Sequence, residues 1–96
     1  MTTLRFERYP VDVERREAFI AAVGALVDAM RTAAGNLWAD VSSAVDDKPS
    51  CLVLSEWRTS ADASAWADSE TANGFLTSID PLLRGEPTVR TFSADT

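Results

Sequence analysis

The pattern of apolar and polar positions predicts a strand followed by a helix in the first third of the chain. Residues 4–9 form a short strand that ends at Pro10. A helix runs from an N-cap at Asp12 to a closing glycine at Gly35, because apolar side chains between them recur every three or four residues. These apolar side chains are Phe19, Val23, Leu26, Val27 and Met30. Gly24 interrupts the helix, either because the sheet approaches closely there or through neutral drift.

Two further strands form a hairpin in the middle of the chain. Residues 36–45 and 50–57 are the strands, and residues 46–49 are the turn between them. The run at 51–54, Cys-Leu-Val-Leu, does not alternate, so we expect its strand to be covered on both faces. One layer of helices covers only one face of a sheet. A partner subunit is the simplest cover for the other face.

A second helix and a closing strand complete the chain. Thr59 and Asp62 have the spacing of a capping box, which predicts a helix start near Ser60. The pattern weakens at residues 73–74, Asn-Gly, and then resumes, so we expect the helix to be interrupted there. Residues 88–92 form the last strand.

The order of these elements, β-α-β-β-α-β, is typical of the split arrangement in ferredoxin-like α+β folds with an antiparallel sheet. A chain of 96 residues makes one domain, so we expect a single domain over residues 1–96. Such a chain buries only about two-thirds of its unfolded surface, and a partner surface would add stability. The composition, 46% hydrophobic and 25% charged, is that of an ordinary globular protein.

The net charge and the missing residue types narrow the function. A net charge of −6 without a basic stripe argues against nucleic acid and anionic membranes as partners. No apolar run approaches the ~20 residues of a membrane span. A single cysteine and a start without a signal-peptide pattern predict a cytoplasmic protein. The chain has no histidine, so no imidazole serves as a base or as a ligand of a metal or haem iron, and no carboxylate cluster suggests a metal site.

Short motifs along the chain resemble those of antibiotic biosynthesis monooxygenase (ABM) domains. The segments that carry the resemblance are Ala34-Gly35-Asn36-Leu37, Glu56-Trp57, the Ala-rich helix with Trp66, and Phe75-Leu76. The resemblance extends from about Leu4 to Phe92. It implies that two protomers close their open sheet faces against each other as a dimeric α+β barrel.

The resemblance also implies a cofactor-independent monooxygenase acting on a small aromatic substrate and O2. The substrate would be an electron-rich phenol, anthrone or hydroquinone of natural-product biosynthesis. Such a molecule reduces O2 itself once it is deprotonated, so no flavin or metal is required. Two alternatives remain open, namely a polyketide cyclase or isomerase on the same fold and a non-catalytic, dimeric small-ligand-binding module. A cyclase works without oxygen, and a binding module forms no product.

Glu7 and Arg90 are the candidate catalytic residues. Glu7 stands in the middle of a strand, where a carboxylate is out of place unless it faces a cleft, a partner or a cation. By resemblance it takes the position of an asparagine that haem-degrading relatives place over their ligand. Desolvation raises the pKa of a carboxylate toward that of a useful general base, whereas an ion pair with Arg5, Arg8 or Arg90 would be structural. Arg90 would stabilise developing negative charge.

Five residues are candidates for binding the substrate. Trp57 and Trp66 stand at the two ends of one strand-to-helix corner, where indole rings would wall a cleft for a flat ligand unless both are core residues. In the family, a tryptophan at the first position lines the cleft of anthrone-oxidising members, and one at the second lines that of haem-degrading members. Trp38 suits core or interface packing, with a substrate contact as the alternative. Phe75 replaces the axial histidine of haem-degrading relatives, and Asn73 is either a ligand contact or a turn residue.

Three other residues receive structural or lesser roles. Glu56 points to the face opposite Trp57, so we expect a structural pairing, for example with an arginine of the closing strand. Asp40 is a lesser candidate for a polar contact in the cleft. Cys51 is expected to be a small buried hydrophobe.

Overall fold

The computed structural model describes residues 1–43 and 50–94 of the chain, so the predicted turn and the last two residues of the predicted second strand lie outside the described residues. The elements are β1 (Thr2–Pro10), η1 (Val13–Arg15), α1 (Arg16–Arg31), β2 (Asn36–Ser43), β3 (Ser50–Trp57), α2 (Ser60–Ala67), α3 (Glu70–Ile79), η2 (Asp80–Leu82) and β4 (Thr88–Ala94). Within this described part, no helix is long and apolar enough to cross a membrane.

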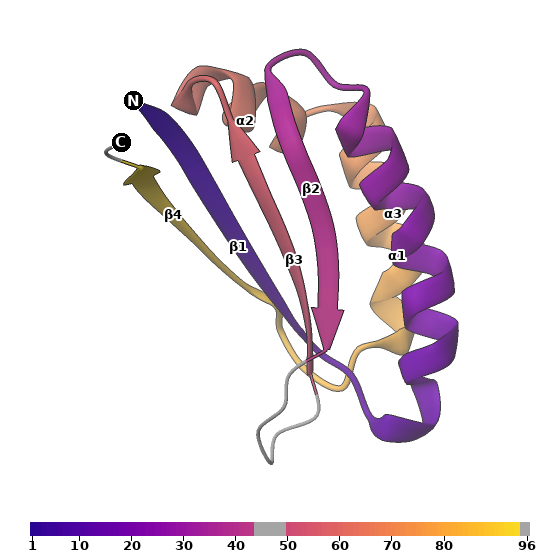
Figure 1. Ribbon diagram of the computed structural model, residues 1–96. Coiled ribbons are helices and arrows are strands. Elements are labelled where there is room, and N and C mark those ends of the chain that lie inside the picture. Colours follow the sequence, from indigo (N-terminus) through magenta and orange to yellow (C-terminus); the bar gives the residue numbers. More distant parts are fainter. Residues whose placement is uncertain (44–49, 95–96) are drawn as a thin grey trace.

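The four strands form one antiparallel sheet in the order β2-β3-β1-β4, with the helices on one of its faces (Figure 1). This arrangement confirms the predicted ferredoxin-like α+β fold. The closing strand β4 pairs with β1 and lies at the edge of the sheet farthest from α1 (Figure 1). The helix layer therefore covers the sheet unequally, because α1 packs mainly over β2 at the opposite edge.

The core lies between the helices and the covered face of the sheet. The five apolar residues predicted for the stripe of α1 are all buried, with exposed fractions of at most 3%. On β3, Cys51, Val53 and Trp57 are fully buried on the same side, and Cys51 is a free thiol as expected. Burying each large apolar side chain contributes about 1.5–3 kcal/mol relative to leaving it exposed.

The other side of the sheet, here called the open sheet face, is apolar and only partly covered. Strand register places Leu4 and Phe6 of β1 beside Phe92 of β4 and Leu54 of β3 on this face. The Phe6 and Phe92 rings lie 5.4 Å apart and remain 38% and 43% exposed. The non-alternating run 51–54 is thereby explained, since its odd positions pack under the helices and its even positions lie half-buried on the open sheet face.

The first helix begins differently from the prediction. The Asp12 side chain makes no capping hydrogen bond, and a short 3-10 turn, η1, precedes α1. Instead, the Asp12 carboxylate lies 3.6 Å from the guanidinium of Arg84, in the segment that leads to β4. The ion pair therefore joins the start of the first helix to the end of the helical layer.

The second helix breaks earlier than the prediction. The predicted break at residues 73–74 is wrong, because Asn73 and Gly74 lie inside α3. The interruption falls at residues 68–69, where the Ser69 hydroxyl accepts a hydrogen bond from the Ala72 amide at 3.1 Å and donates one to the Trp66 carbonyl at 2.6 Å. Ser69 thus starts a new helix while it satisfies a carbonyl of the preceding one.

Gly35 links α1 to β2 in a conformation that other residues avoid. Its φ is +82°, and a Cβ there would lie 2.2 Å from Oδ2 and 2.6 Å from Cβ of Asp62. Asp62 is held in place by the predicted cap, in which its amide donates to Thr59 Oγ1 at 3.1 Å. Gly24, in contrast, has no atom within 4 Å of the position of an added Cβ, so a close approach of the sheet does not explain this glycine.

Replacing these two glycines should change stability in opposite directions. We expect Gly35→Ala to lower the free energy of unfolding by about 2–4 kcal/mol, since it adds left-handed strain and a clash with α2. The matched change Gly24→Ala should raise it by about 0.5–1 kcal/mol, because alanine suits a helix interior better. Urea unfolding followed by tryptophan fluorescence measures both. Equal effects at the two sites would contradict the role given to Gly35.

Candidate active site

Alternate residues of β1 place Arg5, Glu7 and Tyr9 on the covered face of the sheet. The Glu7 side chain is 6% exposed, and its carboxylate has a neighbour on each side. The Tyr9 hydroxyl donates to Glu7 Oε1 at 2.6 Å, and Arg5 Nε lies 3.4 Å from Glu7 Oε2. A buried carboxylate is therefore held by a hydroxyl and lies within ion-pair distance of Arg5, one of the three arginines named for the structural alternative.

Two atoms of this cluster have unused hydrogen-bonding capacity. Arg5 Nε and Glu7 Oε2 attract each other at 3.4 Å, but they are not oriented for a hydrogen bond, and neither makes one to any other described residue. Leaving a buried polar atom without a hydrogen bond costs about 1–3 kcal/mol. Native structures keep few such atoms, so this pair is a candidate position for a ligand.

Tyr9 supports Glu7 as a neutral hydrogen-bond donor. Burial raises the pKa of the Tyr9 hydroxyl far above its ordinary value, and the negative charge of Glu7 and the hydrogen bond to it raise this pKa further. The positive charge of Arg5 opposes this shift only partly. Tyr9 therefore keeps its proton near neutral pH and fixes the orientation of the Glu7 carboxylate.

Trp57 and Trp66 stack on each other at the strand-to-helix corner. Their ring centroids are 6.3 Å apart with an interplanar angle of 25°, and their exposed fractions are 0% and 9%. The indole N–H of Trp57 donates to Ser55 Oγ at 3.0 Å, and Ser55 is the cross-strand neighbour of Arg5. A row of polar groups thus connects the tryptophan pair to the Arg5–Glu7 pair along one face.

The two pairs are nevertheless separate positions on that face. Trp57 lies opposite Thr3, whereas Glu7 is four residues further along β1, which corresponds to about 13 Å at 3.3 Å per residue. A ligand that contacts both pairs must therefore be long as well as flat.

The residues of the edge strand beside the Arg5–Glu7 pair are exposed to solvent. Val89 and Thr91 of β4 lie opposite Glu7 and Arg5, and both are exposed. The helices therefore do not cover β4 on this face, in agreement with its place at the far edge of the sheet (Figure 1). The Arg5 side chain keeps an exposed fraction of 16%. The Arg5–Glu7 pair therefore lies on the covered face, near the edge of the helix layer.

Arg90 does not share a site with Glu7 in one chain. The cross-strand partner of Glu7 is Val89, so its neighbour Arg90 projects from the opposite side of the sheet, opposite Phe6. The Arg90 guanidinium lies 6.0 Å from the ring centroid of Phe92, on the open sheet face. The expectation that Arg90 stabilises charge beside Glu7 therefore needs correction, because strand alternation separates the two side chains.

Trp38 and Glu56 also lie on the open sheet face. Trp38 is 41% exposed, and its indole N–H donates to Glu56 Oε1 at 2.7 Å. Glu56 accepts a second hydrogen bond from the Thr2 hydroxyl, and the bonds from Thr2 and Trp38 lower the pKa of this carboxyl. The predicted opposite facing of Glu56 and Trp57 is confirmed, but the hydrogen-bond partners are not arginines of the closing strand.

Asp40, the lesser candidate, is also remote from Glu7. It lies opposite Leu54, on the open sheet face, and its carboxylate is 3.8 Å from Arg31 Nη2 at the end of α1. Asp40 therefore takes part in a surface ion pair.

The remaining two candidates lie in separate surface grooves of α3. Asn73 is exposed, donates from Nδ2 to the Ser69 carbonyl at 2.9 Å, and shares a groove with Leu76 and Thr77. Phe75 is half-buried against the core and lines a mainly apolar groove with Gly74. The structure therefore does not bring Asn73 and Phe75 together in one of these grooves.

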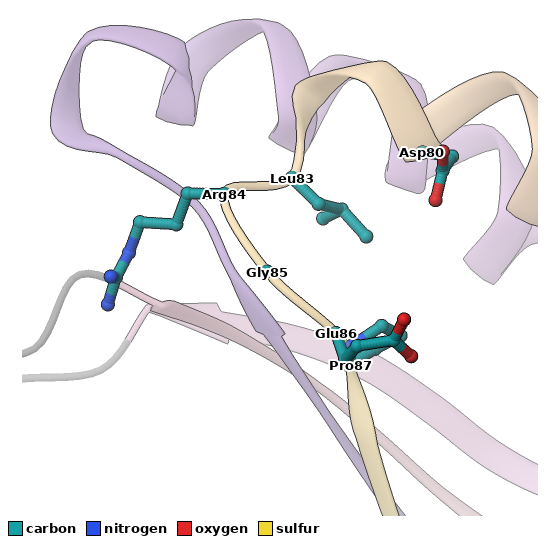
Figure 2. Close-up of a pocket in the computed structure, with 6 residues that line it drawn as sticks. All are labelled: Asp80, Leu83, Arg84, Gly85, Glu86 and Pro87. Atoms are coloured by element: carbon teal, nitrogen blue, oxygen red, sulfur yellow. The ribbon is translucent and has the colours of Figure 1, made fainter.

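A further pocket lies in the segment between η2 and β4. It is lined by Asp80, Leu83, Arg84, Gly85, Glu86 and Pro87, of which Arg84 points away from Leu83 and Asp80 (Figure 2). The direction of the Arg84 side chain agrees with its ion pair to Asp12. None of the predicted site residues lines this pocket. Among the described residues, no three histidine, cysteine or acidic side chains gather as a metal site.

Sequence reasoning did not select Tyr9, Ser55 or, as a ligand-binding group, Arg5. Their signal was present in the alternation of β-strands, because residues two positions apart share a face. Arg5 and Tyr9 are each two positions from Glu7, and Ser55 is two positions from Trp57. Neighbours at this spacing complete the polar row on the covered face.

The comparisons with known proteins identify the family. The model of the antibiotic biosynthesis monooxygenase family matches residues 4–77, so the chain belongs to this family. Among curated proteins, none is significantly similar in sequence.

Solved structures show the same fold at low sequence identity. Rv0793 from Mycobacterium tuberculosis superposes with a TM-score of 0.86 at 14% identity, over 100% of this chain and 97% of that one. A structure from Nitrosomonas europaea, named for the same family, gives 0.87 at 15% identity over 97% and 89% of the two chains. One from Deinococcus radiodurans, also named for this family, gives 0.88 at 12% identity over 98% and 93%. At such identities the likeness concerns the fold alone.

The titration of Tyr9 tests the buried cluster directly, since it is the chain's one tyrosine. Tyrosinate absorbance should show that its pKa lies well above the ordinary 10.0 in the folded protein. Glu7→Gln should bring the pKa down toward that value, whereas the exposed control Glu14→Gln should not. The unfolded chain loses this proton near the ordinary pKa and the folded chain does not, so stability should decline as the pH rises above about 10. Titration of the folded protein at the ordinary pKa would contradict the buried Tyr9–Glu7 contact.

Proposed function

We propose that the chain is a cofactor-independent monooxygenase that oxidises an electron-rich phenol, anthrone or hydroquinone with O2 in natural-product biosynthesis. Membership of the family supports this class of reaction. The observation that carries the proposal is the Glu7 carboxylate, with one oxygen bound by Tyr9 and the other, Oε2, without a hydrogen-bond partner among the described residues. A fixed carboxylate with one oxygen free of hydrogen bonds is suited to accept a proton from a bound substrate.

The chemistry requires little from the protein beyond binding and proton transfer. Glu7 would accept a proton from the substrate, and the resulting anion would pass electrons to O2. For an anthrone, the ring CH2 becomes a carbonyl, so one oxygen atom enters the product and the other leaves as water. The protein's contribution would be to hold the ring beside the carboxylate and to limit the access of water.

The stacked tryptophans are proposed as the wall for the aromatic part of the substrate. Trp66 is the more accessible of the two, at 9% exposure. A flat ring system stacks well on an indole face. Because the tryptophans lie along the face from Glu7, an extended, fused-ring substrate would fit this arrangement better than a single ring.

The open sheet face is proposed as the contact with a second copy of the chain. It exposes Phe6, Phe92 and Trp38 together, and nothing in the described part of the chain covers them. A second sheet packed on this face would bury these side chains and form the dimeric α+β barrel expected from the family. Arg90 and Glu56 would then belong to the dimer interface and not to the catalytic cluster.

Oxygen uptake by the metal- and flavin-free protein tests the activity. With a panel of anthrones and hydroquinones, uptake should exceed autoxidation, and Glu7→Gln should lower kcat by about 100-fold because the proton acceptor is lost. The control Glu17→Gln, on the exposed side of α1, should keep full activity. Trp66→Ala should raise KM. Full turnover by Glu7→Gln would contradict the assignment of the base.

The same assay distinguishes the alternatives. Product formation that continues under nitrogen would identify a cyclase or isomerase. Ligand-dependent quenching of tryptophan fluorescence without any product would identify a binding module. Either result would overturn the oxygenase proposal.

Sedimentation at micromolar concentration tests the dimer. The wild-type protein should sediment as a dimer, and Phe92→Glu should weaken dimerisation by at least about tenfold, because it places a charge in an apolar interface. Ile20→Glu is the matched control, since Ile20 is a similarly exposed apolar residue, at 38%, on α1. A monomeric wild-type protein would show that the open sheet face has another role.

A further inference from the structure

Arg5 and Glu7 place a donor and an acceptor of opposite charge 3.4 Å apart on the covered face of the sheet. Arg5 Nε can donate a hydrogen bond and Glu7 Oε2 can accept one, yet neither does so with a described residue. The Glu7 side chain is 6% exposed, so bulk water reaches it poorly. A group that both donates and accepts would satisfy both atoms, and a hydroxyl is the smallest such group.

We propose that this pair binds the hydroxyl group of a neutral phenol, or of the enol form of an anthrone, as one recognition unit. The hydroxyl donates to Glu7 Oε2, and its oxygen accepts from Arg5 Nε. Tyr9 is a positioning residue that keeps Glu7 Oε1 occupied and so directs Oε2 to the ligand. This inference rests on the proposed function and assigns the recognition of the substrate's hydroxyl group to Arg5 and Glu7.

The proton transfer balances without adding buried charge. The O–H bond of the ligand breaks, its electron pair stays on the ligand oxygen, and the proton forms a new O–H bond on Glu7 Oε2. Before the transfer the site holds the cation of Arg5 and the anion of Glu7. Afterwards it holds the same cation and the phenolate or enolate anion. The charge on Arg5 thus stabilises the new anion as it forms, the role that the sequence suggested for Arg90.

The same geometry predicts which ligands are excluded. An ionised carboxylic acid would bring a second carboxylate next to Glu7, and two buried like charges repel each other. An aryl ether of the same shape has no donor, so it would leave Glu7 Oε2 without a partner.

Calorimetric titration of the wild-type protein with three naphthalene probes tests the selectivity. We expect 1-naphthol to bind at least about tenfold more tightly than 1-methoxynaphthalene and 1-naphthoate, because only the naphthol supplies a donor without a charge. Equal or tighter binding of either comparison probe, or no binding of 1-naphthol, overturns the proposal. This comparison requires no variant, so it does not depend on how a substitution affects folding.

Two substitutions then test each partner separately. Glu7→Gln should reverse the preference, with 1-naphthoate gaining at least about tenfold over 1-naphthol, because the repelling charge is removed while Arg5 remains. The Arg5→Gln variant should bind 1-naphthol no more tightly than the comparison probes, and the Arg5→Lys variant should retain part of the preference for 1-naphthol. The control variant Arg15→Gln, on η1, should retain the full preference. Circular dichroism confirms that each variant is folded. A preference that does not change in Glu7→Gln or Arg5→Gln overturns the proposal.

The binding measurements separate this inference from the oxygenase itself. Selective binding of 1-naphthol without oxygen uptake on any panel substrate would support the recognition unit and count against the oxygenase. Oxygen uptake that is unaffected by Arg5→Gln would support the oxygenase and overturn the recognition unit.

Discussion

The burial of the Glu7 carboxylate is the constraint on which the candidate site depends. A charged group at 4% exposure is stable only with compensating partners, and Tyr9 and Arg5 supply them from the same strand. The compensation is incomplete, because Arg5 Nε and Glu7 Oε2 retain hydrogen-bonding capacity. A core selected for stability alone would replace such a cluster with apolar residues at little cost or with a gain. The cluster lies beside an exposed edge strand and is not required for packing, which is why it is proposed as the functional site.

Strand alternation then divides the polar residues into two groups. Arg5, Glu7, Ser55 and Trp57 lie under or beside the helices, whereas Trp38, Glu56 and Arg90 lie on the open sheet face. Residues of the second group form hydrogen bonds with one another, such as the one from Trp38 to Glu56. These contacts stabilise a surface whose aromatic residues still need a cover. One sheet thus carries the proposed catalytic site on its covered face and the proposed dimer contact on its open face, and neighbouring residues in sequence point to different faces.

Much of the fold could be predicted from local patterns, because its causes are local. The stripe of α1, the cap at Thr59 and the non-alternating run of β3 each follow from residue spacing. Two predicted details were wrong. The Asp12 side chain does not cap the first helix, because it pairs with Arg84, which is distant in sequence. The second helix breaks before Asn73, because Ser69 caps a new helix there. The site was harder, because Arg90 and Glu7 stand on strands that are distant in sequence and meet only through strand pairing. Alternation within β1 would have indicated Arg5 and Tyr9, but the facing of Arg90 required the register of β4 against β1.

The tryptophan pair belongs to the core and is also the proposed wall of the ligand site. Trp57 is fully buried and hydrogen-bonded to Ser55, so the core fixes its position. Trp66 stacks on it from α2 and is 9% exposed. A core role and a proposed ligand-binding role are therefore compatible for these residues. The buried ring of Trp57 would support the ring of Trp66, which would contact the ligand. A wall built in this way is preorganised, and a flat substrate would bind to it without ordering new side chains. If both positions bind the substrate as proposed, the separation between Trp57 and Glu7 along the sheet would set its minimum length.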